Sequence, residues 1–185
     1  MKREKGITLV ELVAGVAVAA ILVSLSIPPF RHQMKSAAAM AESHQLLSLL
    51  ARARVEAIKH NRVVTLCRSA DGVACGGTWS QGWLLFVDAN RNGSRDEAET
   101  VLAVGRPGNG YRLRLAAFGS PNRMRFSPAG FTLAGNGTFR LCPEDGDVHY
   151  ARAVIVNKAG RARISGDRDG DGVHEDAQGK PLTCP

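Results

Sequence analysis

The sequence predicts an α+β fold, in which one long amino-terminal helix is followed by a small head of antiparallel strands. Three features support this prediction: an apolar run near the amino terminus, a stretch without glycine or proline after it, and short β-branched or aromatic runs between turn residues further on. Hydrophobic residues make up 44% and charged residues 22% of the 185 residues, which excludes a disordered chain and a polytopic membrane protein. The formal net charge of +7 makes a basic surface available to an anionic partner.

The apolar run extends from Ile7 to Ile27, and Glu11 is its only charged residue. A helix of this length spans a bilayer core of about 30 Å, so we expect a transmembrane segment, and the run is longer than the apolar region of a secretory signal peptide. A carboxylate at the centre of a bilayer costs about 2.5–3.5 kcal/mol, so Glu11 needs a partner or a function. Pro28 follows the run and is expected to bend or loosen the helix. By length alone, the run also fits an ordinary single-pass anchor.

The helix is expected to continue from Arg31 to about His60, because this stretch contains no Gly or Pro and is dominated by good helix formers. Spacings of four, three and four residues place one apolar stripe on this part of the helix, formed by Leu46, Leu50, Ala53 and Ala57. We expect this stripe to lie on the head.

Short strand-like runs separated by Gly, Pro and Asn-Gly turns occupy the chain after Asn61. The predicted strands are Arg62–Cys67, Gly82–Val87, Thr100–Val104, Tyr111–Leu115, Arg123–Phe126, Thr138–Leu141 and Ala153–Asn157. A head of this size is large enough for its own core, in which we place Trp79, Trp83 and Tyr150.

Four cysteines lie in the head, which the expected anchor would place in an oxidising compartment. Four cysteines allow three disulfide connectivities. Proximity in the sequence favours Cys67 with Cys75, and Cys142 with Cys184. The spacing does not resemble that of a zinc site.

Two acidic loops match the pattern of calcium-binding loops. In the first, the oxygen ligands would be Asp88, Asn90, Asn92, Asp96 and Glu99, with Gly93 at the turn. An Asn-Gly hairpin tip without calcium is favoured for this loop, because its flanks are predicted strands and an EF-hand needs helices there. In the second loop the ligands would be Asp167, Asp169, Asp171 and Glu175, and the repulsion between these acids favours a bound cation such as calcium.

Arginines without any acid occur between Val101 and Pro143, and they indicate either a solvated sheet face or a contact with acidic neighbours. A second basic feature is the sequence Gly-Arg-Ala-Arg at residues 160–163. Glycine lets the backbone turn, and Arg161 and Arg163 would present their guanidinium groups on one side to phosphate oxygens. We expect Lys158 and Arg152 to widen this patch.

The segment Gly6-Ile7-Thr8-Leu9-Val10-Glu11 resembles the processing site of type IV prepilins. The resemblance implies that a prepilin peptidase cuts after Gly6 and that the new amino terminus at Ile7 is methylated, although Phe is commoner than Ile at that place. It also implies that Glu11 pairs with the amino-terminal ammonium of a neighbouring subunit, and that Pro28 belongs to the same helix.

The head resembles the GspH/FimT family of minor pilins and pseudopilins. The matching segments are Trp79–Asp88, Asn90–Gly93, Glu99–Leu102, Phe126–Gly130, Leu141–Cys142 and Gly160–Arg161. The resemblance implies a pilin-like fold, with the long helix laid against two small antiparallel sheets. Residues 160–163 also resemble the GRxR motif of FimT-type pilins that bind DNA for uptake.

These resemblances imply a leader at 1–6, a transmembrane or filament-core helix at 7–28, an amphipathic helical half at 29–60 and a periplasmic head at 61–185. We expect a non-enzymatic minor pilin, because the sequence shows no catalytic constellation. It would help to prime or cap type IV pili. Capture of double-stranded DNA would be an added role if Arg161 and Arg163 contact phosphates, and otherwise these arginines belong to a solvated turn. Its expected partners are other major and minor pilins, the prepilin peptidase and the bacterial inner membrane. The alternative is the H-type minor pseudopilin of a type II secretion system.

Overall fold

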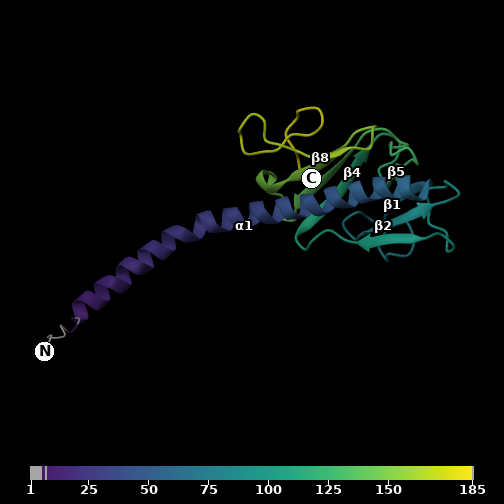
Figure 1. Cartoon of the computed structure of the whole chain (residues 1–185). Helices are drawn as coiled ribbons and strands as arrows, with labels where there is room; N and C mark the ends of the chain where they lie inside the picture. Colours follow the sequence, from purple (N-terminus) through teal and green to yellow (C-terminus); the bar gives the residue numbers. More distant parts are fainter. Residues whose placement is uncertain (1–5, 7, 185) are drawn as a thin grey trace. The chain divides into compact units, whose positions relative to one another are not determined.

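The computed structural model describes residue 6 and residues 8–184, with only the backbone described for 23–29 and 31. By its internal contacts the chain divides into two compact units, residues 1–37 and 38–185. Figure 1 shows the helix and the strands of the head. The predicted start of the mature chain at Ile7 lies outside the described residues.

A single helix, α1, extends from Leu9 to His60 and includes the backbone of Pro28. Within the part of the chain that the structure describes, no helix combines the length and the apolar character that crossing a membrane requires. The helix ends where Asn61 adopts a left-handed conformation (φ 48°) and the Arg62 amide donates to the Ala57 carbonyl. This is a common way to satisfy the last carbonyls of a helix.

The part of α1 after residue 38 buries the predicted apolar stripe. Leu46, Leu50, Ala53 and Ala57 are each at most 6% exposed, which confirms the prediction that this stripe faces the head. Ala53 and Ala57 are completely buried, and their small side chains allow strands to approach the helix closely.

The head contains two four-stranded antiparallel sheets. The first has the order β3-β2-β1-β5, formed by β1 (Val63–Arg68), β2 (Trp83–Asp88), β3 (Val101–Gly105) and β5 (Arg123–Phe126). The second has the order β4-β6-β7-β8, formed by β4 (Tyr111–Ala117), β6 (Gly137–Pro143), β7 (Arg152–Val156) and β8 (Ala162–Ile164). A short 3-10 helix, Val148–Tyr150, precedes β7.

One hydrophobic core joins α1 to both sheets. It combines the helix stripe with Leu66 and Leu85 of the first sheet and Phe139 and Val154 of the second. Trp79 packs edge-on against Phe139, with ring centroids 5.2 Å apart, and its Nε1 donates to the Pro121 carbonyl at 2.7 Å. The expected place of Trp79 in the core is therefore confirmed.

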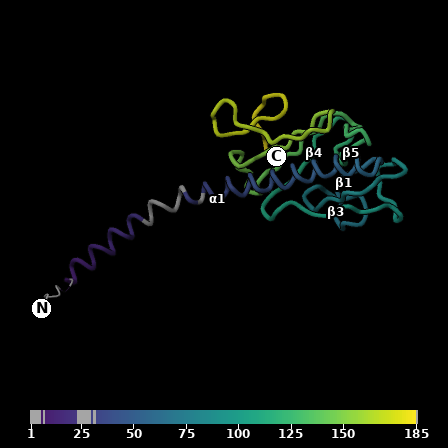
Figure 2. The backbone as a smooth tube through the Cα atoms, in the orientation of Figure 1, coloured from purple at the N-terminus to yellow at the C-terminus, as the bar shows by residue number. Residues whose placement is uncertain are grey.

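Both predicted disulfides form. Cys67 is bonded to Cys75, and Cys142 of β6 is bonded to Cys184 across 42 residues of sequence. Beside the second disulfide, Leu182 is buried against Ala153, so the carboxy-terminal segment (yellow in Figure 2) covers part of the second sheet on the face opposite the main core.

Candidate functional site

The amino-terminal motif forms a helix cap. The Oε2 atom of Glu11 accepts hydrogen bonds from the backbone amide and the hydroxyl of Thr8, both at 3.0 Å, and the Glu11 amide donates to Thr8 Oγ1 at 3.3 Å. Thr8 and Glu11 therefore make a reciprocal capping box at the start of α1. Sequence reasoning missed this role of Thr8, although Thr-x-x-Glu before an apolar run is the usual sequence pattern of a capping box. Gly6 is exposed, ahead of the cap.

The Gly160-Arg161-Ala162-Arg163 segment forms the turn into β8. Gly160 has a φ of 72°, and its amide donates to the Asn157 carbonyl at 2.9 Å. The Asn157 side chain in turn accepts the Arg161 amide at 3.0 Å. The turn is therefore fixed by its own backbone and by Asn157, a residue that sequence reasoning did not single out.

Gly160 also lies against a second glycine turn. A Cβ atom built on Gly160 would lie 2.0 Å from the Gly130 carbonyl oxygen, so no side chain fits there without moving the backbone. The same carbonyl accepts a hydrogen bond from Arg54 Nε of α1 at 3.0 Å. The structure therefore brings together two segments that the sequence separates, 126–130 and 160–163, and holds both against the helix.

Three of the four basic residues predicted for the patch are exposed: Lys158, Arg161 and Arg163. Arg152 does not belong to it, because this side chain is only 6% exposed and its Nη1 donates to the carbonyls of His149 and Ala151. Burial lowers the pKa of Arg152. The prediction that Arg152 widens the patch is wrong, because residues 152, 154 and 156 of β7 point to the core side of the sheet.

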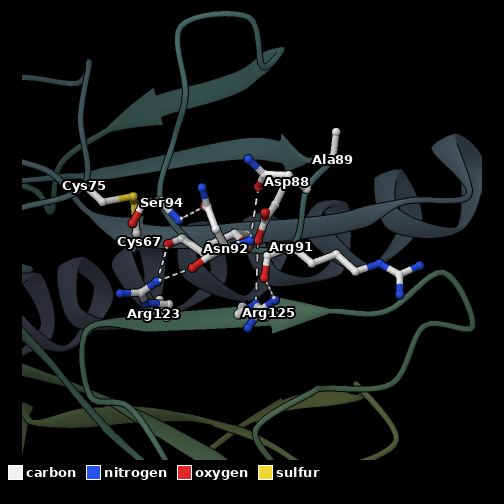
Figure 3. A network of polar contacts seen from close by, with 12 residues as sticks. Cys67, Cys75, Asp88, Ala89, Arg91, Asn92, Ser94, Arg123 and Arg125 are labelled. Carbon is white, nitrogen blue, oxygen red and sulfur yellow. Dashed lines mark hydrogen bonds and ion pairs between the residues drawn. A yellow bond between two sulfur atoms is a disulfide. The ribbon is translucent and has the colours of Figure 1, made fainter.

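The first acidic loop, residues 88–99, connects β2 to β3 (Figure 3). Asp88 is fully buried, and its Oδ2 accepts hydrogen bonds from Thr65 Oγ1 at 2.7 Å and the Gly93 amide at 3.1 Å. The Nε atom of Arg125 lies 3.6 Å from the same oxygen. A guanidinium group therefore offsets the buried charge of Asp88.

Two arginines of β5 fasten this loop, as Figure 3 shows. Arg123 Nη1 donates to the carbonyls of Asn92 and Gly93, and Arg125 Nη2 donates to the Arg91 carbonyl at 2.7 Å. These two members of the acid-free arginine segment thus have a structural role within the head.

The other oxygen atoms predicted as calcium ligands in this loop accept hydrogen bonds from the loop itself. Asp96 Oδ2 accepts from the side-chain amides of Asn90 and Asn92, at 2.6 and 3.1 Å. The two oxygens of Glu99 accept the backbone amides of Ala89 and Asp96, at 2.8 and 3.1 Å. These contacts fit the hairpin-tip alternative, and calcium in this loop stays a prediction.

The second acidic loop gathers three carboxylates. One oxygen from each of Asp167, Asp169 and Glu175 lies within 4.8 Å of the others, and Glu175 is buried. Asp171 is not in this group, and its Oδ1 accepts the Val173 amide at 2.7 Å. The three clustered residues could hold a cation together, and repulsion between their charges would favour it.

Replacement of Gly160 by alanine is expected to lower the free energy of unfolding by at least about 2 kcal/mol, because it adds a left-handed strain and a clash with Gly130. Urea unfolding followed by tryptophan fluorescence measures the loss. Gly166→Ala is the matched control: an added Cβ meets nothing within 4 Å there, so the expected change is within about 0.5 kcal/mol. Equal stability of the two variants would contradict the close contact.

Calcium is expected to raise the Tm of the head through the second acidic loop, since a ligand that binds only the native state stabilises it. Thermal unfolding with calcium and with EGTA measures the rise, which Asp169→Asn should abolish. Asp96→Asn should leave the rise intact. If Asp96→Asn abolished the rise and Asp169→Asn did not, calcium would be assigned to the first loop. If calcium did not raise the Tm of the parent, both loops would be excluded as calcium sites.

Comparison with known proteins identifies the family. The family model of the type II transport protein GspH matches residues 42–160, and the prokaryotic N-terminal methylation motif matches residues 1–27. No curated protein of matching sequence was found.

Solved structures share the fold. The type IV minor pilin FimU of Pseudomonas aeruginosa superposes with a TM-score of 0.57 at 19% identity, covering 85% of this chain and 100% of that one. The minor pseudopilin EpsH of the type 2 secretion system of Vibrio cholerae gives a TM-score of 0.50 at 12% identity, covering 72% of this chain and 98% of that one. The chain therefore belongs to the GspH family of minor pilins and pseudopilins, and it carries the amino-terminal methylation motif of these filament subunits.

Proposed function

We propose that this chain is a minor type IV pilin, which enters the filament through α1 and helps to prime or cap assembly. The proposal is supported mainly by two features that occur at the two ends of one continuous helix. The methylation motif covers its start, and the GspH head is built on its end. Such a chain has an assembly element and a separate folded head, which is what a filament subunit needs.

The chemistry of the amino terminus supports this role. Cleavage after Gly6 would create a positively charged amino group beside an apolar helix, and a neighbouring Glu11 carboxylate would offset its desolvation in a filament core. In the single chain the Glu11 carboxylate is bound by Thr8. Assembly would therefore exchange a local cap for a contact between subunits.

The alternative is an H-type minor pseudopilin of a type II secretion system. Its subunits would use the same helix and the same head, and only the assembled machine differs. Deletion of the gene separates the two functions, since a minor pilin is needed for surface pili and a minor pseudopilin for the release of secreted proteins.

DNA binding is a second proposed function, which the exposed Lys158, Arg161 and Arg163 support. The turn that carries them is held by Asn157 and by the contact with Gly130, so the backbone that positions the arginines is fixed. Guanidinium groups on such a turn would contact phosphates and would not read base edges. The binding would therefore be weak and largely independent of sequence.

For the filament function, intact-mass analysis of the membrane form is expected to show loss of residues 1–6 and gain of one methyl group. Glu11→Ala should still be processed but should be lost from purified filaments, because the contact between subunits is removed. Glu97→Ala, at an exposed position of the head, is the control and should assemble normally. An unprocessed parent, or normal assembly of Glu11→Ala, would contradict the proposal.

For DNA binding, the log affinity of the full chain for duplex DNA should fall against log salt with a slope of about −3, if roughly three phosphates are contacted. The double change Arg161→Gln and Arg163→Gln should remove most of this binding without unfolding the head. Arg62→Gln with Arg106→Gln removes the same charge at two other exposed sites and should have little effect. Equal losses in the two double variants would indicate attraction by net charge alone.

A further inference from the structure

Three arginines gather on the outer face of the second sheet. Arg112 and Arg114 lie on β4, and Arg140 of β6 is paired directly opposite Arg114. The residues between them, such as Leu113 and Leu141, point to the opposite face and are buried in the core. Like charges in opposite positions of neighbouring strands repel, so this arrangement costs stability unless something offsets it.

These arginines line a small cavity of about 150 Å³. Ala116 and Cys142 contribute to its wall, and so does Thr183 of the carboxy-terminal segment. The disulfide between Cys142 and Cys184 fastens that segment to the sheet beside the cavity. The described side chains that line the cavity include no acid, so its walls are basic and apolar.

The guanidinium groups of these three arginines have N–H donors that no described residue uses fully. The Nε atoms of Arg112 and Arg140 are buried and have no hydrogen-bond partner among the described residues, and no partner is found there for the Arg114 side chain either. The contacts they make are long: Arg112 Nη2 donates to the Glu144 carbonyl at 3.4 Å, and Arg140 Nη2 lies 3.8 Å from Asp176 Oδ2. The Nε atoms of Arg95, Arg125 and Arg152 also lack a hydrogen-bond partner, so this state alone does not mark a binding site. What distinguishes the cavity is that three weakly bound guanidinium groups lie together there, and they can donate to an acceptor from outside the chain.

We propose that Arg112, Arg114 and Arg140 bind a phosphate group in this cavity. The three guanidinium groups carry three positive charges, and Asp176 beside Arg140 offsets at most one of them. A phosphate monoester carries about −1.5 to −2 at pH 7 and inorganic phosphate carries between −1 and −2, so either matches the remainder better than a single carboxylate does. Its oxygens can also accept from several arginines at once, in the fork geometry that guanidinium groups favour.

The surface beside the cavity has room for the rest of a phosphorylated molecule. A groove of about 1190 Å³ shares Ala116 and Arg140 with the cavity and extends over β6 and β7 to Arg163 and Lys158. The phosphate could thus be free, or it could be the end group of a larger compound lying in the groove. This site is separate from the assembly helix and does not depend on the proposed filament function.

Isothermal titration of the full chain, in a detergent without phosphate, tests the proposal. Inorganic phosphate should bind the parent, and Arg114→Gln should weaken binding by roughly tenfold or more, since a charge-assisted contact is lost. Arg62→Gln is the matched control and should bind as the parent does. Glucose 6-phosphate is the second probe: binding at least as tight as that of phosphate assigns the site to phosphate monoesters, and weaker binding assigns it to free phosphate.

Three results would overturn the proposal. They are a parent that does not bind either phosphate probe, an Arg114→Gln variant that binds as tightly as the parent, and acetate that binds as tightly as phosphate. The last result would make the cavity a carboxylate site. Arg114 is exposed and makes no contact on which the described fold depends, so loss of folding does not confuse the comparison.

Discussion

The burial of one helix stripe against two sheets is the interaction on which the rest of the head depends. Neither four-stranded sheet encloses a core alone, because each has one face that needs a cover. The stripe of α1 supplies that cover for both, and Ala53 and Ala57, with no exposed surface, allow the strands to come close. The Gly130 and Gly160 turns are then held against the same helix through Arg54.

Local patterns in the sequence predicted the helix and most strands. The helix was predicted from the apolar run, the absence of Gly and Pro after Arg31 and the abundance of helix-forming residues. Strands such as Arg123–Phe126 are bounded by turn residues on both sides. The strand Ala162–Ile164 was expected only as the second half of a strand-turn-strand junction, and its bounds were not predicted because three residues show too little alternation. The division of the strands between two sheets followed only from the family resemblance, since β5 pairs with β1 across a long stretch of intervening chain.

The arginines show why the candidate sites were harder to predict than the fold. Arg125 offsets the buried charge of Asp88, Arg152 binds carbonyl groups beside the core, and Arg161 faces solvent. The sequence of β7 shows no alternation that would place Arg152 on one face, because the four residues after it are all apolar and all five positions are buried. The cavity at Arg112, Arg114 and Arg140 depends on strand register and on a segment distant in the chain, and neither is visible in a short window of sequence.

The disulfide between Cys142 and Cys184 links the arginine cavity to the redox state of the protein. Thr183, which helps to wall the arginine cavity, is adjacent to the cysteine that fastens the carboxy-terminal segment to β6. A newly made, reduced chain lacks this covalent link and would hold the segment only through contacts such as that of the buried Leu182 with Ala153. Formation of the disulfide would therefore stabilise one wall of the cavity once the head reaches a compartment in which disulfides persist.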